Sequence, residues 1–227
     1  MISLFLALAG DPAIGAKAKI APPPPPALSH VAPSAAPDTM ELSSGAIRVS
    51  DWIAASGDNH GLPYAIIDKA TASLILFDGA GKERGRTPVL IGIAIGDDAT
   101  PGVGSKDLSE IGPAEKTTPA GRFLAKFGPA AGRQRILWVD YATSVAIHPI
   151  PTPGKKSEHR RERMLSPTPD DNRITFGCIN VPTNFYAKRV KPLFTRKGGY
   201  VYIMPDTKAL ETVFPRLMVQ AVLDNRR

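Results

Sequence analysis

The chain has 227 residues, enough for one domain with a substantial hydrophobic core and a tail. Its hydrophobic (43%) and charged (22%) fractions are ordinary for a globular protein, and its net charge of +7 favours anionic partners such as the acidic bacterial envelope. The basic residues form no nucleic-acid module, and a single cysteine excludes an intramolecular disulfide and a Cys-rich zinc site, so we expect no nucleic-acid partner, metal or cofactor.

The chain begins with an apolar leader, which we place at residues 1–20. Met1 to Ala9 form an apolar run that ends in Ala-Leu-Ala before Gly10, like the end of a secretory signal peptide. The run is too short to span a bilayer, which takes about 20 apolar residues. We therefore expect export to the periplasm or cell envelope; the alternatives are a membrane tether at the N-terminus and a disordered apolar terminus.

A proline- and alanine-rich linker follows at residues 21–45. Pro22 to Pro26 are consecutive prolines, and Pro33 and Pro37 continue the pattern. Prolines lack N–H donors and favour the polyproline II conformation, so this stretch is predicted to be a semi-rigid spacer.

Residues 46–206 are predicted to form one mainly β domain. Closely spaced short apolar runs are bounded by Gly, Pro and Asp, which is typical of a β-sandwich or barrel. The predicted strands cover residues 64–68, 73–78, 88–96, 121–127, 136–141, 144–148 and 200–204.

One or two helices are expected to pack on this sheet. The first runs from about Thr183, a candidate N-cap, to Leu193. The second forms a C-terminal helix and tail at residues 207–227, with helix from about 208 to 223, and Pro215 should start or kink it.

The single cysteine, Cys178, lies in the run Ile-Thr-Phe-Gly-Cys-Ile-Asn-Val-Pro. A cysteine nucleophile needs a base or positive field nearby and backbone N–H groups that can hold an oxyanion. Gly177 allows close backbone approach to a substrate, and the helix expected after Pro182 would favour a thiolate. These features predict a nucleophile; the alternative is a buried core cysteine.

The chain has four histidines that could act as the base for this cysteine. His30 lies in the linker, His60 lies early in the domain, and His159 lies in a charged run where cationic neighbours disfavour its protonated form. His148 ends an apolar strand and precedes Pro149, so we expect it to project from an ordered edge. His148 is therefore the predicted base.

Together these residues resemble the L,D-transpeptidase catalytic domain of bacterial cell-wall enzymes, whose pattern is a His, a gap, then Ser/Thr-His-Gly-Cys-x-Asn or Arg. The opening hairpin at residues 66–78 and the Thr-Pro-Ala-Gly-Arg-Phe segment at 118–123 resemble the same family, so the similarity covers about residues 64–204. The motif positions are matched by His148, Thr175, Gly177, Cys178 and Asn180.

Two features depart from the family pattern. Phe176 stands where the family has its second His, and the gap between His148 and Cys178 is longer than usual. The additional residues, 152–173, form a charged, proline-containing insert. Two readings stay open for it, a flap over the cleft and a solvated loop.

The resemblance implies a two-step acyl transfer on peptidoglycan stem peptides, and thus a part in peptidoglycan biosynthesis and cell-wall organisation, by a monomeric enzyme. Cys178 would attack the stem, and backbone N–H groups around Gly177 would hold the oxyanion. Thr175 and the Pro149 carbonyl would orient His148. Asn180 and Phe176 would bind substrate or shape the site.

Three alternatives to a transpeptidase remain at this stage. Water as acceptor would make the same site an L,D-carboxypeptidase or endopeptidase. Phe176 keeps a catalytically inactive, wall-binding homologue in consideration. The acceptor of a transferase is also open: a second stem in a 3–3 cross-link, a lipoprotein or a D-amino acid.

Overall fold

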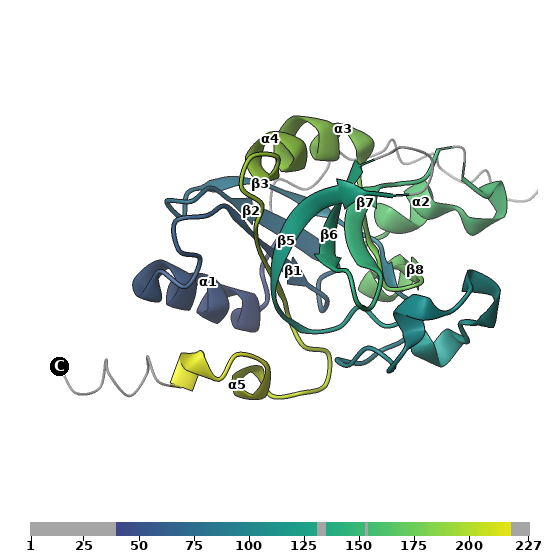
Figure 1. Cartoon of the computed structure of the whole chain (residues 1–227), viewed down its shortest axis with the longest axis horizontal. Coiled ribbons are helices and arrows are strands. Elements are labelled where there is room, and N and C mark those ends of the chain that lie inside the picture. Colours follow the sequence, from purple (N-terminus) through teal and green to yellow (C-terminus); the bar gives the residue numbers. More distant parts are fainter. Residues whose placement is uncertain (1–39, 131–134, 153, 219–227) are drawn as a thin grey trace, which may run out of the picture. The chain divides into compact units, whose positions relative to one another are not determined.

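The computed structural model in Figure 1 describes residues 40–130, 135–152 and 154–218. The apolar leader predicted for residues 1–20 and the linker up to residue 39 lie outside the described residues. The remainder forms an eight-stranded mixed sheet that is nearly closed, like a barrel, with a few helices packed on it. The predicted mainly β architecture is confirmed.

The order of strands in the sheet brings the first and last parts of the domain together. β1 is parallel to β10, β7 is parallel to β9, and the other neighbours are antiparallel. Across the sheet the strands are β3 (Glu83–Pro88), β2 (Ser73–Phe77), β1 (Tyr64–Asp68), β10 (Gly199–Ile203), β5 (Gly121–Pro129), β6 (Arg135–Asp140), β7 (Val145–Pro149) and β9 (Ile179–Val181).

The two edges of this sheet approach each other. Leu90, just after β3, exchanges two backbone hydrogen bonds with Asn180 of β9, at 3.0 and 2.9 Å. Beside this bridge, β4 (Ile91–Gly92) and β8 (Arg173–Thr175) form a separate two-stranded sheet. The segment that follows β3 therefore runs along the strand that carries the Cys178 motif.

Both faces of the central strands are buried, which explains their unbroken apolar sequence. In β1, Ala65 and Ile67 face the interior of the barrel, whereas Tyr64 and Ile66 face an outer layer. Alternation of side chains along a strand produces these two layers.

Helix α1 (Ser44–Ser56) covers the outer layer and was not among the predicted elements. The Ser43 hydroxyl caps its N-terminus, and Gly57, at φ +66°, ends it. The helix crosses residue 45, where we had placed the end of the linker. Its buried residues, at helical spacing, are Ala46, Val49, Trp52 and Ile53.

The helix expected at residues 183–193 is present as one continuous helical segment. It comprises α3 (Thr183–Phe185), the π-helical turn η7 (Tyr186–Val190) and α4 (Lys191–Phe194). Pro182 occupies the N-cap position that the sequence suggested for Thr183. The segment packs on the interior core through Tyr186, Val190 and Phe194.

Of the C-terminal helix predicted for residues 208–223, the structure describes the part up to residue 218, and this part is interrupted. Helix α5 (Leu210–Val213) ends before Pro215, and residues 216–218 are helical again. Pro215 lacks an N–H group and therefore interrupts the helix, as its sequence position indicates. Residues beyond 218 lie outside the description.

The insert at residues 152–173 contains three short helices: η5 (Lys156–Glu158), α2 (Arg160–Met164) and η6 (Pro169–Asn172). Met164 and Asn172 are buried, and the Asn172 side-chain amide donates to the carbonyl of Val89 at 2.7 Å. Residues 160–173 are thus packed on the domain, which does not fit a solvated loop.

The remaining connection, residues 93–120, carries three 3₁₀ turns: η1 (Val103–Ser105), η2 (Leu108–Glu110) and η3 (Pro113–Glu115). Within the described ranges, every helix is too short or too polar to cross a bilayer.

Candidate active site

The structure brings Cys178 and His148 to the same strand edge. β7 and β9 are neighbouring parallel strands, and His148 is in register with Asn180. Cys178 immediately precedes β9, and its Sγ lies 3.5 Å from the carbonyl oxygen of Ser144, just before β7. The thiol therefore lies beside the beginning of β7 and the imidazole near its end.

The turn that carries Cys178 is held by side-chain contacts from Thr175 and Thr118. Thr175 Oγ1 donates to the Cys178 carbonyl at 2.6 Å and accepts from the Gly177 N–H at 3.1 Å. Thr118 Oγ1 donates to the Gly177 carbonyl at 2.9 Å. Thr175, expected to orient His148, thus shapes the turn that carries Cys178 instead.

Gly177 is required at its position for two reasons. Its φ of +123° lies where residues with a side chain are strained. A Cβ there would also lie 2.6 Å from the backbone oxygen of Thr117. The sequence analysis expected Gly177 to let a substrate approach the backbone. In the structure, Gly177 is needed because the Thr117 backbone lies close to it.

The Cys178 thiol is half-buried and protonated in the resting site. Burial raises its pKa, while the backbone N–H of Ala146 and the positive charge of Arg160 act in the opposite direction. We had expected the following helix to favour a thiolate, but β9 lies between Cys178 and α3. Desolvation therefore outweighs the stabilising contacts.

His148 is a neutral imidazole with both ring nitrogens engaged. Nδ1 lies 2.9 Å from the carbonyl oxygen of Pro149, and Nε2 lies 3.1 Å from Nδ2 of Asn180. Burial lowers the pKa of His148; the Pro149 carbonyl raises it, and the charge of Arg160 lowers it further. The Pro149 carbonyl occupies the orienting position that the resemblance implied.

Asn180 connects His148 to the insert. Its side chain is fully buried, and its Oδ1 accepts from Arg160 at 2.6 Å. Arg160 Nε in turn donates to Glu158 at 2.6 Å. The sequence analysis assigned Asn180 to substrate binding or shaping of the site and did not single out Arg160 or Glu158.

Phe176 lies on the rim of the site, with 38% of its surface exposed. The ammonium group of Lys116 lies 3.9 Å from the centre of its ring, within the range of a cation–π interaction. Ile93, also partly exposed, donates its N–H to the Thr175 carbonyl at 3.1 Å. The rim beside Cys178 thus combines apolar surface with one positive charge.

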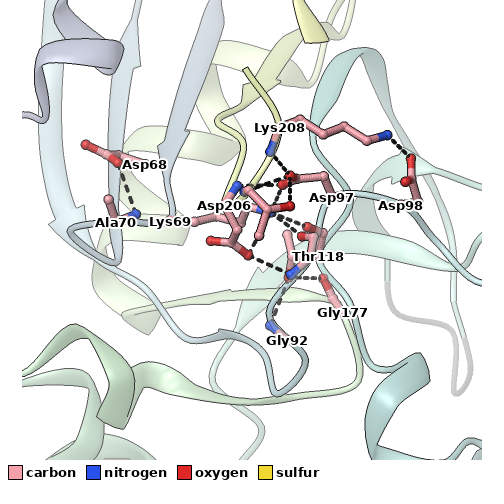
Figure 2. Close-up of polar contacts among 12 residues, drawn as sticks. Asp68, Lys69, Ala70, Gly92, Asp97, Asp98, Thr118, Gly177, Asp206 and Lys208 are labelled. Carbon is pink, nitrogen blue, oxygen red and sulfur yellow. Dashed lines mark hydrogen bonds and ion pairs between the residues drawn. The ribbon is translucent and has the colours of Figure 1, made fainter. Parts of the chain in front are cut away.

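A buried ion cluster lies beside Thr118, the residue that contacts Gly177 (Figure 2). Lys69 Nζ lies 3.0 Å from Asp97 and 3.1 Å from Asp206, and it donates to the carbonyls of Gly96 and Thr118 at 2.6 and 3.0 Å. A buried charge is tolerated where it is paired and hydrogen-bonded to this extent.

Asp97 ties the C-terminal segment to this cluster. Burial alone would raise the pKa of Asp97, but backbone N–H donors from Asp206, Lys208 and Thr207 hold it well below its ordinary value. The carboxylate is therefore ionised, and it fixes residues 206–208 beside the loop that contains Gly96. Through Thr118 the same cluster supports the turn before Cys178.

Fold and site together define a barrel-like β domain with a cysteine and a histidine at one strand edge. No protein-family model matches the chain, and no curated protein is significantly similar to it. In the part of the chain that the structure describes, no group of three His, Cys, Asp or Glu side chains could hold a metal ion.

Proposed function

We propose that the protein is an exported L,D-transpeptidase that acts on the tetrapeptide stems of peptidoglycan. The observation that carries the proposal is the position of the half-buried Cys178 and the neutral His148 on two neighbouring parallel strands, with Cys178 just before β9 and His148 in β7. The ordered sequence pattern from residue 64 to 204, which resembles that family, supports the same assignment.

The reaction begins from a neutral thiol and a neutral imidazole. As the substrate carbonyl enters, the Asn180 amide gives up its hydrogen bond to His148 Nε2, and the Cys178 proton moves to Nε2 while sulfur attacks the carbonyl carbon of the third stem residue. The tetrahedral intermediate then expels the terminal D-alanine, whose nitrogen takes the proton from the imidazolium. A thioester on Cys178 and free D-alanine result.

The second half-reaction transfers the acyl group to an amine. His148 Nε2 accepts the amine proton as nitrogen attacks the thioester, and the returning proton restores the Cys178 thiol as the carbon–sulfur bond breaks. Water in place of the amine gives hydrolysis, so the acceptor alone separates the transferase from the carboxypeptidase.

Backbone donors are needed for the oxyanion of both intermediates. The Gly177 N–H is already bonded to Thr175, so of the two donors expected from sequence the Cys178 N–H is the one to consider. Removal of one oxyanion donor typically costs about 3 kcal/mol of transition-state stabilisation. Lys116 on the rim provides a positive charge that suits stem carboxylates.

The test is muropeptide analysis after incubation of the full-length protein with disaccharide-tetrapeptide. The proposal requires a 3–3 cross-linked dimer with the wild type and no product with Cys178→Ala. Tripeptide without dimer identifies a carboxypeptidase instead. No conversion, with an unreactive thiol, identifies an inactive wall-binding homologue.

Export is part of the proposal and has a separate test. A fusion of residues 1–45 to a reporter active only outside the cytoplasm should give an active reporter. Fractionation of the same fusion distinguishes a cleaved signal from a retained membrane anchor. A reporter that stays in the cytoplasm contradicts export through this segment.

A further inference from the structure

The insert between β7 and β8 supplies a side chain to the histidine of the proposed active site. Arg160, the first residue of α2, donates from its guanidinium NH1 group to Oδ1 of Asn180 at 2.6 Å. Asn180 Nδ2 lies 3.1 Å from His148 Nε2, and His148 Nδ1 lies 2.9 Å from the Pro149 carbonyl oxygen. These contacts form one continuous chain.

The chemistry of the groups fixes the direction of every bond in this chain. A guanidinium can only donate, so the oxygen of the Asn180 amide must face Arg160. The amide NH₂ then faces His148, and because it too can only donate, Nε2 must accept. The proton of the neutral imidazole is therefore on Nδ1, where the Pro149 carbonyl accepts it.

Burial favours one orientation of the Asn180 amide in this series of hydrogen bonds. Asn180 is fully buried, and the Arg160 side chain is 14% exposed and anchored at its other end by Glu158, at 2.6 Å. Turning the amide of Asn180 over would place its NH₂ against the guanidinium, two donors without an acceptor. A clash of two buried donors is unfavourable enough to leave one orientation of the amide dominant.

We infer that Arg160 is a positioning residue for His148: it fixes the Asn180 amide, whose NH₂ donates to Nε2 and so holds the resting imidazole with Nε2 unprotonated. The inference rests on the proposed function insofar as His148 acts as the base. It also gives the insert a role, since Arg160 begins helix α2 of the insert.

The charged groups around the pair come from two sides. Arg160 and Glu158 belong to the insert, and Lys116, from the connection at residues 93–120, lies over the ring of Phe176. Loss of the Arg160 charge should therefore also be felt at the thiol, in the direction of a less acidic Cys178.

The test is the ring ¹⁵N spectrum of His148 in the full chain, assigned with a His148→Gln variant. The wild type should show a protonated Nδ1 and an unprotonated Nε2. Arg160→Met should instead show a protonated Nε2. Arg160→Lys keeps a cationic donor and should show the wild-type state, with Nδ1 protonated and Nε2 unprotonated. Arg161→Met, at the exposed neighbouring position, is the matched control and should match the wild type.

A second variant covers the case in which Arg160→Met does not fold. Asn180→Asp places an acceptor against Nε2 and should give a protonated Nε2. An unprotonated Nε2 in that variant, or an unchanged spectrum in folded Arg160→Met, overturns the inference.

Alkylation of Cys178 by iodoacetamide provides an independent readout. Its pH midpoint should move upward in Arg160→Met and stay unchanged in Arg161→Met. Neither this measurement nor the ¹⁵N spectrum uses a peptidoglycan substrate. If the transpeptidase assignment is wrong, the ¹⁵N spectrum and the alkylation midpoint can still show the effect of Arg160. If the positioning role is wrong, the protein should still form the same muropeptide products.

Discussion

The hydroxyl of Thr118 donates to the carbonyl oxygen of Gly177, the residue before Cys178, at 2.9 Å. The same hydroxyl accepts from the Gly92 N–H at 2.8 Å, and the Thr118 carbonyl accepts from Lys69 at 3.0 Å. Thr118 thus joins the buried ion cluster to the turn that presents the thiol, as Figure 2 shows.

Thr118→Val should therefore loosen the turn that carries Cys178 while keeping the volume of the side chain. The buried Gly92 N–H loses its acceptor, so the free energy of unfolding should fall by about 1–3 kcal/mol. Urea unfolding and the rate of Cys178 alkylation measure the two effects. Thr152→Val, at an exposed position, should change neither; equal effects at both positions would contradict the account.

Gly177→Ala should disrupt the turn more severely. The new Cβ would lie 2.6 Å from the Thr117 oxygen, at a φ of +123°. Strain of this kind costs roughly 1–3 kcal/mol, and the backbone shift should abolish acyl transfer. Gly112→Ala, with an ordinary φ of −67°, is the control. Wild-type turnover in the Gly177 variant would show that the turn is not needed in this form.

Lys69→Met should destabilise the domain strongly. It leaves Asp97 buried without its cation, whereas Asp206 keeps Arg173 at 2.7 Å. Removal of one partner of a buried ion pair costs about 3–5 kcal/mol. Lys208→Met removes an ammonium from the exposed pair with Asp98 and should cost under about 1 kcal/mol. Chemical unfolding of both variants compares them; similar losses would mean that the Lys69 cluster carries no special stability.

The resting thiol should react slowly at neutral pH. Burial raises the pKa of Cys178, so the thiolate fraction at pH 7 is smaller than that of a free cysteine. The rate of iodoacetamide alkylation should therefore rise with pH and reach half its maximum above the pH at which a free thiol does. A midpoint below that of a free thiol would show a thiolate at rest and a different starting state.

The sequence contained enough information to predict the sheet, and it led to the proposal of His148 and Cys178 as the two central residues. Short apolar runs separated by turn residues carry a local signal, and His148 and Cys178 stand in an ordered motif. Helix α1 had a local signal too, since Ala46, Val49 and Ile53 recur at helical spacing, but the proline-rich stretch before it suggested continued linker.

The supporting contacts depend on residues far apart in the chain and could not be predicted from spacing. Arg160 stands in a run of similar charged residues, and nothing local marks it as the one that reaches Asn180. Nothing in the local sequence marks Lys69 and Asp97 as buried either, although the fold buries both. The thiol pKa was likewise predicted in the wrong direction, because desolvation depends on tertiary packing.

The measurement that tests the central claim most directly is intact mass analysis of the full-length protein during incubation with disaccharide-tetrapeptide. We expect a transient adduct equal to the substrate less D-alanine, mapped to Cys178 by digestion and absent from Cys178→Ala. His148→Gln, which lacks the base, should accumulate it far more slowly. Release of D-alanine without any adduct, or an adduct that persists in Cys178→Ala, would contradict the assignment of Cys178 as the nucleophile.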